Sequence, residues 1–235
     1  MLQASEPILL GRDQRQRGLV PPQRLAACHA LVIGVGAIGR QVALQLAALG
    51  VPRMTLFDDD TVQIENLAVQ GYWPDDLYKP KVEATAVLGR RIYPQLQVQP
   101  IAERFQRSTA KHWPADADLL VFACVDKIGT RRMLWEALRD RAAFFADGRM
   151  NAEVIRILAV GVPALDEGYR KTLFGAAEAY NGPCTARSTI YTAAIAAGLL
   201  IGQMTKWLRD LPLDADFTLN LLANELSVPS GSAAL

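Results

Sequence analysis

The chain has 235 residues, of which 51% are hydrophobic, and 25 lysine and arginine residues oppose 24 aspartate and glutamate residues. This length and apolar content suffice for one large α/β domain with its own core. A formal net charge of +1 argues against a general nucleic-acid-binding surface and against an acidic tail.

The three cysteines, Cys28, Cys124 and Cys184, are too few and too scattered for a disulfide framework. The sequence has no CxxC pair, so we expect no zinc. Residues 1–18 lack the basic and apolar regions of a signal peptide, and the longest apolar segment, residues 191–202, is too short to cross a membrane. We therefore expect a soluble, cytoplasmic protein with no membrane partner.

Residues 1–25 are predicted to form a polar N-terminal arm, because Pro21 and Pro22 interrupt helix formation and the segment is rich in arginine. Its arginines are Arg12, Arg15, Arg17 and Arg24. A solvated surface would by itself explain this composition. We expect residues 26–210 to form the folded domain and residues 211–235 to supply a C-terminal strand or tail.

Strands and helices alternate after the arm. Residues 29–34 form a continuous apolar run typical of a buried strand, residues 38–50 have helical spacing, and residues 54–58 predict a second strand. The crossover has the length of a strand–helix–strand unit with parallel strands. The later elements are a helix over 80–94, an extended segment over 96–105, a strand over 118–126, a helix over 130–141, and strands over 142–148 and 153–162.

This alternation predicts an α/β fold: a Rossmann-like, mostly parallel sheet flanked by helices, with additional antiparallel strands, in a single domain. Residues 163–187 form a long connection rich in small and polar residues, and such connections are often functional. Residues 188–208 predict a long apolar helix, which we expect in the core or at a subunit interface.

Three glycines lie between the first strand and the first helix. Gly34 permits a tight turn, Gly36 allows a phosphate to approach the backbone, and Gly39 allows the helix to pack closely on the strand. This pattern indicates a nucleotide without saying which one, and alone it would favour a nicotinamide-dependent oxidoreductase.

Acidic residues follow two of the predicted strands. Asp58 ends the second strand, where a carboxylate can bind ribose hydroxyls, and Asp126 ends another at the same edge of the sheet. Mg²⁺ prefers one or two carboxylates together with phosphate oxygens, so a metal ion at Asp126 would explain this arrangement. Lys81 begins a helix after the acidic loop and could neutralise phosphate charge.

Five ordered motifs together resemble the ThiF/MoeB/HesA family, the adenylating relatives of ubiquitin-activating enzyme. The motifs are RDQRQ at 12–16, GVGAIG at 34–39, DDDTVQIENLAVQ at 58–70, KPKVEA at 79–84 and CVDKIGTR at 124–131. The resemblance implies a homodimer or pseudo-dimer that uses ATP and Mg²⁺ to activate the C-terminal glycine carboxylate of a small ubiquitin-fold carrier protein. It also admits a conjugating enzyme as a later partner.

By this resemblance, Asp58 holds the ribose, Lys81 contacts the phosphates, and Asp126 places the metal. Arg15 reaches into the site of the neighbouring subunit. The further residues that we assign to nucleotide binding are Gly34, Gly36, Ala37, Gly39, Asp60, Asn66 and Gln70.

Two positions depart from the family pattern. Val69 stands where an arginine usually precedes Gln70, so one phosphate-binding cation is missing, and Lys127 replaces a common asparagine. We expect another residue to compensate for the missing cation, and the candidates are Arg131, Arg132 and Lys79. Without compensation we expect adenylation to be slow or absent, and a non-catalytic scaffold subunit is then one alternative. A tRNA-modifying, ATP-dependent dehydratase is the other alternative, which the near-neutral charge disfavours.

Cys184 precedes the late helix, where several family members place a cysteine. A thiolate near a helix N-terminus has a lowered pKa, so Cys184 could accept the acyl group as a thioester, with Arg187 assisting. Thr185 and Ser188 are hydroxyl alternatives that would need a general base. We assign Arg15, Lys81, Asp126 and Cys184 to catalysis, and we expect His29 and His112 to be structural.

Overall fold

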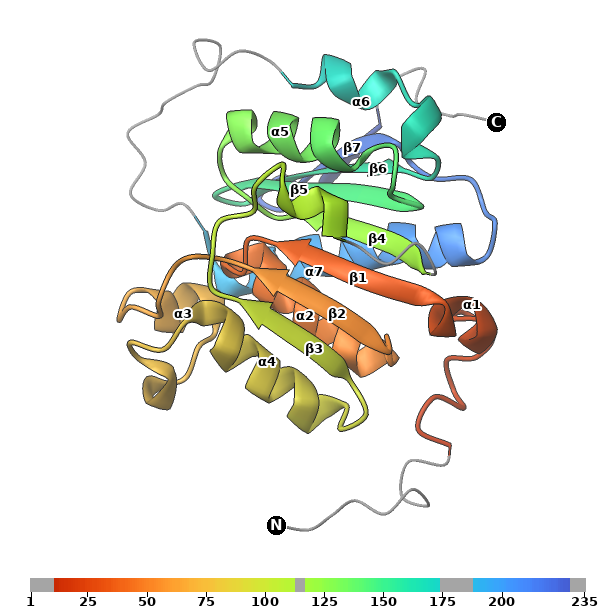
Figure 1. The fold of residues 1–235 in the computed structure, drawn as a ribbon. Helices are drawn as coiled ribbons and strands as arrows, with labels where there is room; N and C mark the ends of the chain where they lie inside the picture. The colour runs from red at the N-terminus through yellow and green to blue at the C-terminus, as the bar shows by residue number, and fades with distance from the viewer. Residues whose placement is uncertain (1–10, 113–116, 174–187, 229–235) are drawn as a thin grey trace.

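In a computed structural model, which describes residues 11–112, 117–173 and 188–228, the strands form one mixed eight-stranded sheet of order β3-β2-β1-β4-β5-β6-β7-β8 (Figure 1). The strands are β1 (Cys28–Ile33), β2 (Arg53–Phe57), β3 (Gln97–Ile101), β4 (Asp118–Ala123), β5 (Phe144–Asn151), β6 (Val154–Val160), β7 (Asp216–Asn220) and β8 (Glu225–Ser227). Pairing is parallel from β3 to β5 and antiparallel from β5 to β8.

The order of the strands creates a crevice at one edge of the sheet. The chain passes from β1 outward to β2 and β3, and then returns to the other side of β1 as β4. The connections that leave β1 and β4 therefore run in opposite directions and separate beyond the carboxyl ends of these strands. In open parallel sheets, ligands bind at such a switch point.

Helices cover both faces of the sheet. The α-helices are α1 (Pro22–Ala26), α2 (Ala37–Leu49), α3 (Asn66–Gln70), α4 (Lys81–Ile92), α5 (Ile128–Leu138), α6 (Gly168–Lys171) and α7 (Ile190–Leu208), and 3₁₀ turns span Pro74–Asp76, Thr109–His112 and Pro163–Leu165. On one face, α2, α4 and α7 bury their apolar sides against alternate strand residues such as Val32 and Phe122. On the other face, α5 and α6 cover the intervening residues, such as Leu31 and Val121.

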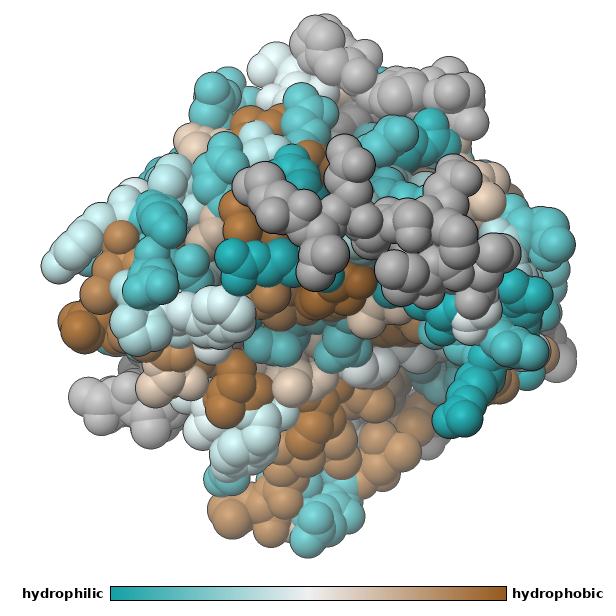
Figure 2. Space-filling model, turned by 90° about the horizontal axis from the view of Figure 1, so that it is seen from below, coloured by the Kyte–Doolittle hydropathy of each residue, from teal (hydrophilic) through white to brown (hydrophobic). Residues whose placement is uncertain are grey.

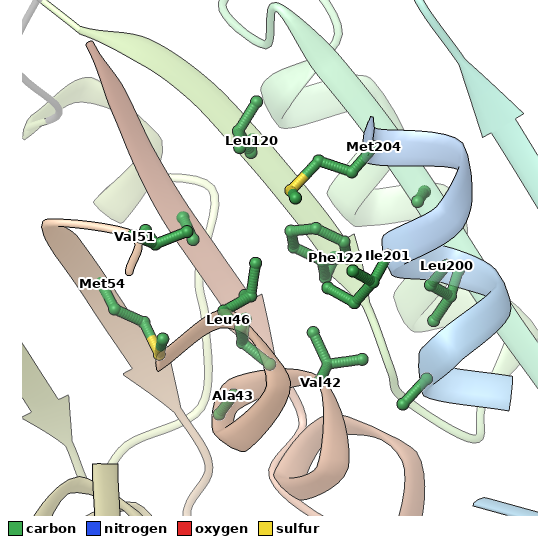
Figure 3. Packing of buried hydrophobic residues seen from close by; sticks show 14 of the residues in the cluster. Val42, Ala43, Leu46, Val51, Met54, Leu120, Phe122, Leu200, Ile201 and Met204 are labelled. Atoms are coloured by element: carbon green, nitrogen blue, oxygen red, sulfur yellow. The ribbon is translucent and has the colours of Figure 1, made fainter. Parts of the chain in front are cut away.

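The larger core is formed where α2 and α7 meet the sheet (Figure 3). Leu46 of α2 and Met204 of α7 point toward Phe122 of β4, and all three side chains are fully buried. Burial of such side chains stabilises a fold by about 1.5–3 kcal/mol each. The predicted apolar helix over 188–208 is therefore a core element, beginning at Ile190.

The predicted fold class is confirmed. The helix and strand boundaries differ by a few residues, and one difference concerns a site residue, because β4 ends at Ala123 and places Asp126 in the following loop. The extended segment predicted over 96–105 ends at Ile101. The short helices α1, α3 and α6 were not predicted, since five residues or fewer give no helical period.

Several exposed apolar side chains lie between β2 and the middle of α4. Ile64 and Tyr78 expose 72% and 76% of their surface, and Trp73 and Val87 each expose 49%. Figure 2 views the molecule from below, the side on which α3 and α4 lie in Figure 1, and shows brown apolar areas among polar side chains on this face.

Within the described part of the chain, no helix combines the length and apolarity needed to span a membrane.

Candidate functional site

The glycine turn between β1 and α2 has different requirements at each glycine. Gly34 has a φ of +85°, and a Cβ there would lie 2.6 Å from the carbonyl oxygen of Cys124. A Cβ on Gly39 would lie 1.8 Å from the carbonyl oxygen of Gly34. Gly36, by contrast, has open space, since the nearest atom to its Cβ position is Nε2 of Gln70 at 4.0 Å. Two glycines thus permit close packing, while the third leaves room for a ligand at the N-terminus of α2.

Asp58 connects this turn to the loop after β2. Its Oδ2 accepts a hydrogen bond from the backbone N–H of Val35 at 2.6 Å, and its Oδ1 accepts one from the N–H of Asp60 at 2.9 Å. Burial raises the pKa of Asp58 above that of an ordinary aspartate, and the two backbone donors oppose this shift. The carboxylate is therefore held at the mouth of the crevice in a fixed orientation.

Lys81, the first residue of α4, is brought to the same loop. Its side chain is 7% exposed, and Nζ lies 2.8 Å from Oδ2 of Asp60. The hydroxyl of Tyr72 donates a hydrogen bond to the carbonyl of Val35 at 2.7 Å, which ties the glycine turn to the segment before α4. The sequence predicted a lysine at this edge, but it gave no sign of the ion pair with Asp60.

These elements surround one cavity of about 730 Å³ at the switch point. Pockets for small ligands in proteins have volumes of about 300–1,000 Å³. The predicted residues that line the cavity are Gly34, Gly36, Ala37, Asp58, Asp60, Gln70, Lys81 and Asp126. The sequence analysis did not single out several other lining residues, which include Asp59, Glu103, Arg104, Phe105, Gly148 and Met150.

Charged side chains of both signs face this cavity. Asp58, Asp59 and Asp60 bring carboxylate oxygens within 4.8 Å of one another, and Arg104 Nε lies 2.6 Å from Oδ2 of Asp59. Asp126 is exposed at the opposite side, in the loop after β4. No sequence motif pointed to Arg104, which lies in an irregular segment after β3.

Three predicted residues do not line the cavity. Gly39 lies in the first turn of α2, packed on Gly34, and Asn66 begins α3, where its Oδ1 accepts a hydrogen bond from the N–H of Gln63 at 2.9 Å. Arg15 lies in the N-terminal arm, outside the cavity lining. The proposed nucleophile Cys184 is outside the described residues, as are Thr185 and Arg187.

The arm packs against the C-terminal end of α2. Arg12 Nη2 donates to the carbonyls of Ala47 and Ala48 at 2.8 and 2.7 Å, and Gln16 Nε2 donates to the carbonyl of Leu49 at 2.7 Å. These donors satisfy carbonyls that a helix end leaves unpaired. In Figure 1 α1 and the part of the arm from Gly11 on lie at the right, by the start of β1, whereas α3 lies at the left, by the carboxyl ends of the strands. Arg15 is exposed at this far end of the molecule.

A buried charge network lies beneath the cavity on β5. Asp147 is fully buried, contacts Arg131 through Oδ1, and accepts hydrogen bonds at Oδ2 from Arg149 Nε and the Tyr169 hydroxyl, both at 2.9 Å. Burial lowers the pKa of Arg131 to about 10, and the charge of Arg149 contributes to the shift. Two guanidinium groups thus share one carboxylate, and Arg131 is both a cavity wall and part of this network.

Replacing Tyr169 with phenylalanine should destabilise the protein by about 1–3 kcal/mol, because a buried, charged acceptor loses a donor. Urea denaturation of the two proteins measures the difference. Tyr169 also packs on Trp135 with ring centroids 4.6 Å apart, a contact that phenylalanine retains. A variant as stable as the wild type would show that the hydroxyl does not support Asp147.

The surroundings of Cys28, Cys124 and His29 favour a structural role for these residues over a catalytic one. Burial raises the pKa values of Cys28 and Cys124 to about 12, which disfavours their thiolates. Cys28 belongs to the core, and Cys124 packs against the same core and also lines the cavity. His29 Nε2 lies 2.9 Å from Thr55 Oγ1 within the sheet.

The sheet order, the glycine turn and the acidic loop around one cavity define an α/β domain with a Rossmann-like fold. The model of the ThiF family matches residues 13–229. The chain belongs to the ThiF family.

Curated relatives match about half of this chain. It is 33% identical over 117 residues to the SAMP-activating enzyme E1 of Haloferax volcanii, a match that covers 49% of this chain and 43% of that protein. It is 32% identical over 111 residues to the sulfur carrier protein ThiS adenylyltransferase of Escherichia coli strain K12, covering 47% of this chain and 44% of that protein. The match thus spans less than half the length of either relative.

Solved structures show the same fold. PaaA superimposes with a TM-score of 0.78 at 17% identity, covering 95% of this chain and 73% of that chain. E. coli MccB with MccA-N7isoASN gives a TM-score of 0.75 at 17% identity, covering 93% of this chain and 71% of that chain. At this identity the likeness establishes the fold alone.

Proposed function

We propose that this chain uses ATP and Mg²⁺ to adenylate the C-terminal glycine carboxylate of a small sulfur-carrier or ubiquitin-like protein. The observation that carries the proposal is the cavity at the switch point, where Gly36, Asp58 and Lys81 face the same space. Its relatives by sequence include adenylyltransferases for sulfur-carrier proteins and an activating enzyme for SAMP.

The residues around the cavity fit a nucleotide. The Asp58 carboxylate is suited to ribose hydroxyls, and the open side of Gly36 leaves the N-terminus of α2 accessible to a phosphate. Lys81 is positioned by Asp60 at 2.8 Å, and a phosphate would compete with that carboxylate for the ammonium group. The electrostatic attraction of Lys81 for phosphate supports its predicted role.

The donor set also fits a magnesium ion. Asp126 is an exposed carboxylate at the cavity, and Mg²⁺ prefers one or two carboxylates, phosphate oxygens and water. When bound, the ion neutralises phosphate charge. The expectation that no zinc is present stays a prediction.

Adenylation joins two anions, so positive charge and alignment must lower the barrier. A carboxylate oxygen forms a bond to the α-phosphorus, the bond from that phosphorus to the β-phosphate bridging oxygen breaks, and pyrophosphate leaves. Lys81 of the same subunit would reduce the repulsion between the carboxylate and the α-phosphate. Arg15 of a partner subunit in a homodimer would do the same.

The position of the arm supports action of Arg15 on a partner. Arg12 holds the arm at the C-terminal end of α2, and a helix of 13 residues is about 20 Å long. Gly36 lies at the other end of this helix, so Arg15, three residues from the anchor, is remote from its own cavity. A second copy could present its arm to this cavity.

We also propose a later transfer from the acyl-adenylate to Cys184. The thiolate sulfur would bond to the acyl carbon and AMP would leave, which gives a thioester. Ser188, four residues further along, lines the cavity, and this proximity in sequence supports the assignment. Trapping a thiol-sensitive adduct that is lost in Cys184→Ala, while adenylation persists, would test this step.

Exchange of labelled pyrophosphate into ATP tests the adenylation step. We expect exchange to require Mg²⁺ and a carrier protein with an intact C-terminal glycine, and the same carrier lacking that glycine is the control. Tight ATP binding without exchange for any carrier tested would contradict the proposal and favour the non-catalytic scaffold that Val69 suggests. Exchange supported by a tRNA would favour the dehydratase.

A further inference from the structure

Arg40, in the first turn of α2, is a buried cation without a counterion. Arg40 exposes only 2% of its surface. Neither its Nε nor its Nη2 has a hydrogen-bond partner. The guanidinium lies over the ring of Tyr72, with Cζ 4.5 Å from the ring centroid. Among the described residues, no carboxylate lies within ion-pair distance of it.

This placement is unfavourable for the protein alone. Removing an ionised group from water without pairing it is costly, and burial lowers the pKa of Arg40. The N-terminal turn of a helix also carries partial positive charge, which repels a cation. Tyr72 offers a cation–π contact, and the charge of Asp76 attracts the guanidinium from beyond ion-pair distance, but these interactions offset only part of the cost. An anion bound close by would offset the remainder.

The guanidinium lies next to the chain segment that contributes Gln70 to the cavity wall. Its Nη1 is 3.6 Å from the Cβ position of Gly71, the residue after Gln70. Gln70 lines the cavity beside Gly36, and its Oε1 is likewise buried without a hydrogen-bond partner. The backbone N–H of Arg40 donates to the carbonyl of Gly36 at 3.0 Å. Gln70 thus has its side chain near the open side of the glycine turn, and the residue that follows it in the chain lies next to the guanidinium of Arg40.

We propose that Arg40 binds a phosphate group of the nucleotide and so supplies the positive charge that Val69 does not provide on α3. This inference rests on the proposed function. In this proposal a change in the Gln70 side chain brings the guanidinium into contact with phosphate oxygens.

The other candidates for this role have partners of their own or lie outside the cavity. Arg131 is engaged by Asp147 and by the carbonyl of Gly148. Arg132 Nη2 donates to the carbonyl of Leu173 at 2.7 Å. Lys79 is exposed on the loop before α4 and is not among the cavity residues.

The test compares ATP with adenosine in binding to the full chain and its Arg40→Met variant by calorimetry. Hydrogen bonds to charged groups contribute about 1.5–3 kcal/mol, so ATP affinity should fall about tenfold to a hundredfold. Adenosine, which lacks phosphate, should bind both proteins equally. Arg91→Met is the matched control, because exposed Arg91 also stacks on an aromatic ring, that of Trp73 at 5.9 Å, but lies outside the cavity.

The melting temperature without nucleotide separates a binding role from a packing role. Removing an unpaired buried charge should leave it unchanged or raise it. A lower melting temperature with an unchanged ATP-to-adenosine ratio would assign Arg40 to packing on Tyr72 and overturn the inference. If the wild type binds ATP and catalyses exchange while Arg40→Met binds ATP equally well, only the inference fails. If the wild type does not bind ATP, the proposed function fails and the inference fails with it.

Discussion

Replacing Gly39 with alanine should destabilise the protein by more than about 4 kcal/mol, the range that marks a specific and severe structural defect. The added methyl would lie 1.8 Å from the carbonyl oxygen of Gly34. This oxygen belongs to the backbone, so no side-chain rotation relieves the overlap, and α2 must move away from β1. Because α2 carries Val42, Leu46 and other core residues, such a shift disrupts the packing shown in Figure 3. Urea denaturation and soluble yield measure the effect.

Gly36→Ala is the matched control for this prediction. Its added methyl meets no atom closer than Gln70 Nε2 at 4.0 Å, so the free energy of unfolding should stay close to that of the wild type. Affinity for ATP should nevertheless fall, because the methyl occupies the space through which a phosphate approaches the backbone. If Gly39→Ala were as stable as Gly36→Ala, the close contact between β1 and α2 would not constrain the fold.

Apolar periodicity was sufficient to predict the fold class because the central strands are buried on both faces. Val32 and Leu31 face opposite cores, so β1 appears in the sequence as an uninterrupted apolar run. The edge of the sheet was harder to predict. β8 consists of exposed residues, and neither alternation nor continuous apolarity marks such a strand.

The candidate site was predictable where its residues follow the carboxyl ends of strands. The positions of Gly36 and Asp58 come from the strand–turn–helix pattern, and the topology brings both to the same cavity. The ion pairs of Asp60 with Lys81 and of Asp59 with Arg104 depend on how two loops approach each other. Arg40 appeared in the sequence as one more polar residue of an amphipathic helix, and only its burial among Tyr72 and Gly71 distinguishes it.

Arg15→Ala should lower the rate of carrier-dependent exchange by about a thousandfold or more, in keeping with arginines supplied across interfaces in phosphoryl transfer. ATP binding should largely persist, because Arg15 lies at the end of α2 remote from its own cavity. Asp126→Ala should also abolish exchange, but Asp126 lines the cavity of its own subunit. Each site would therefore take its Asp126 from one subunit and its Arg15 from the other.

Mixed dimers separate these contributions. Arg15→Ala and Asp126→Ala chains, co-expressed with different tags and purified through both, should form dimers in which one site has both lesions and the other has none. Such dimers should recover about half of the wild-type activity, because one of the two equivalent sites is intact. Lys81→Ala paired with Asp126→Ala is the control, since both residues line the same subunit's cavity and each site keeps one lesion. Recovery in the control pair, or none in the Arg15 pair, would mean that the arm does not act on the partner's site.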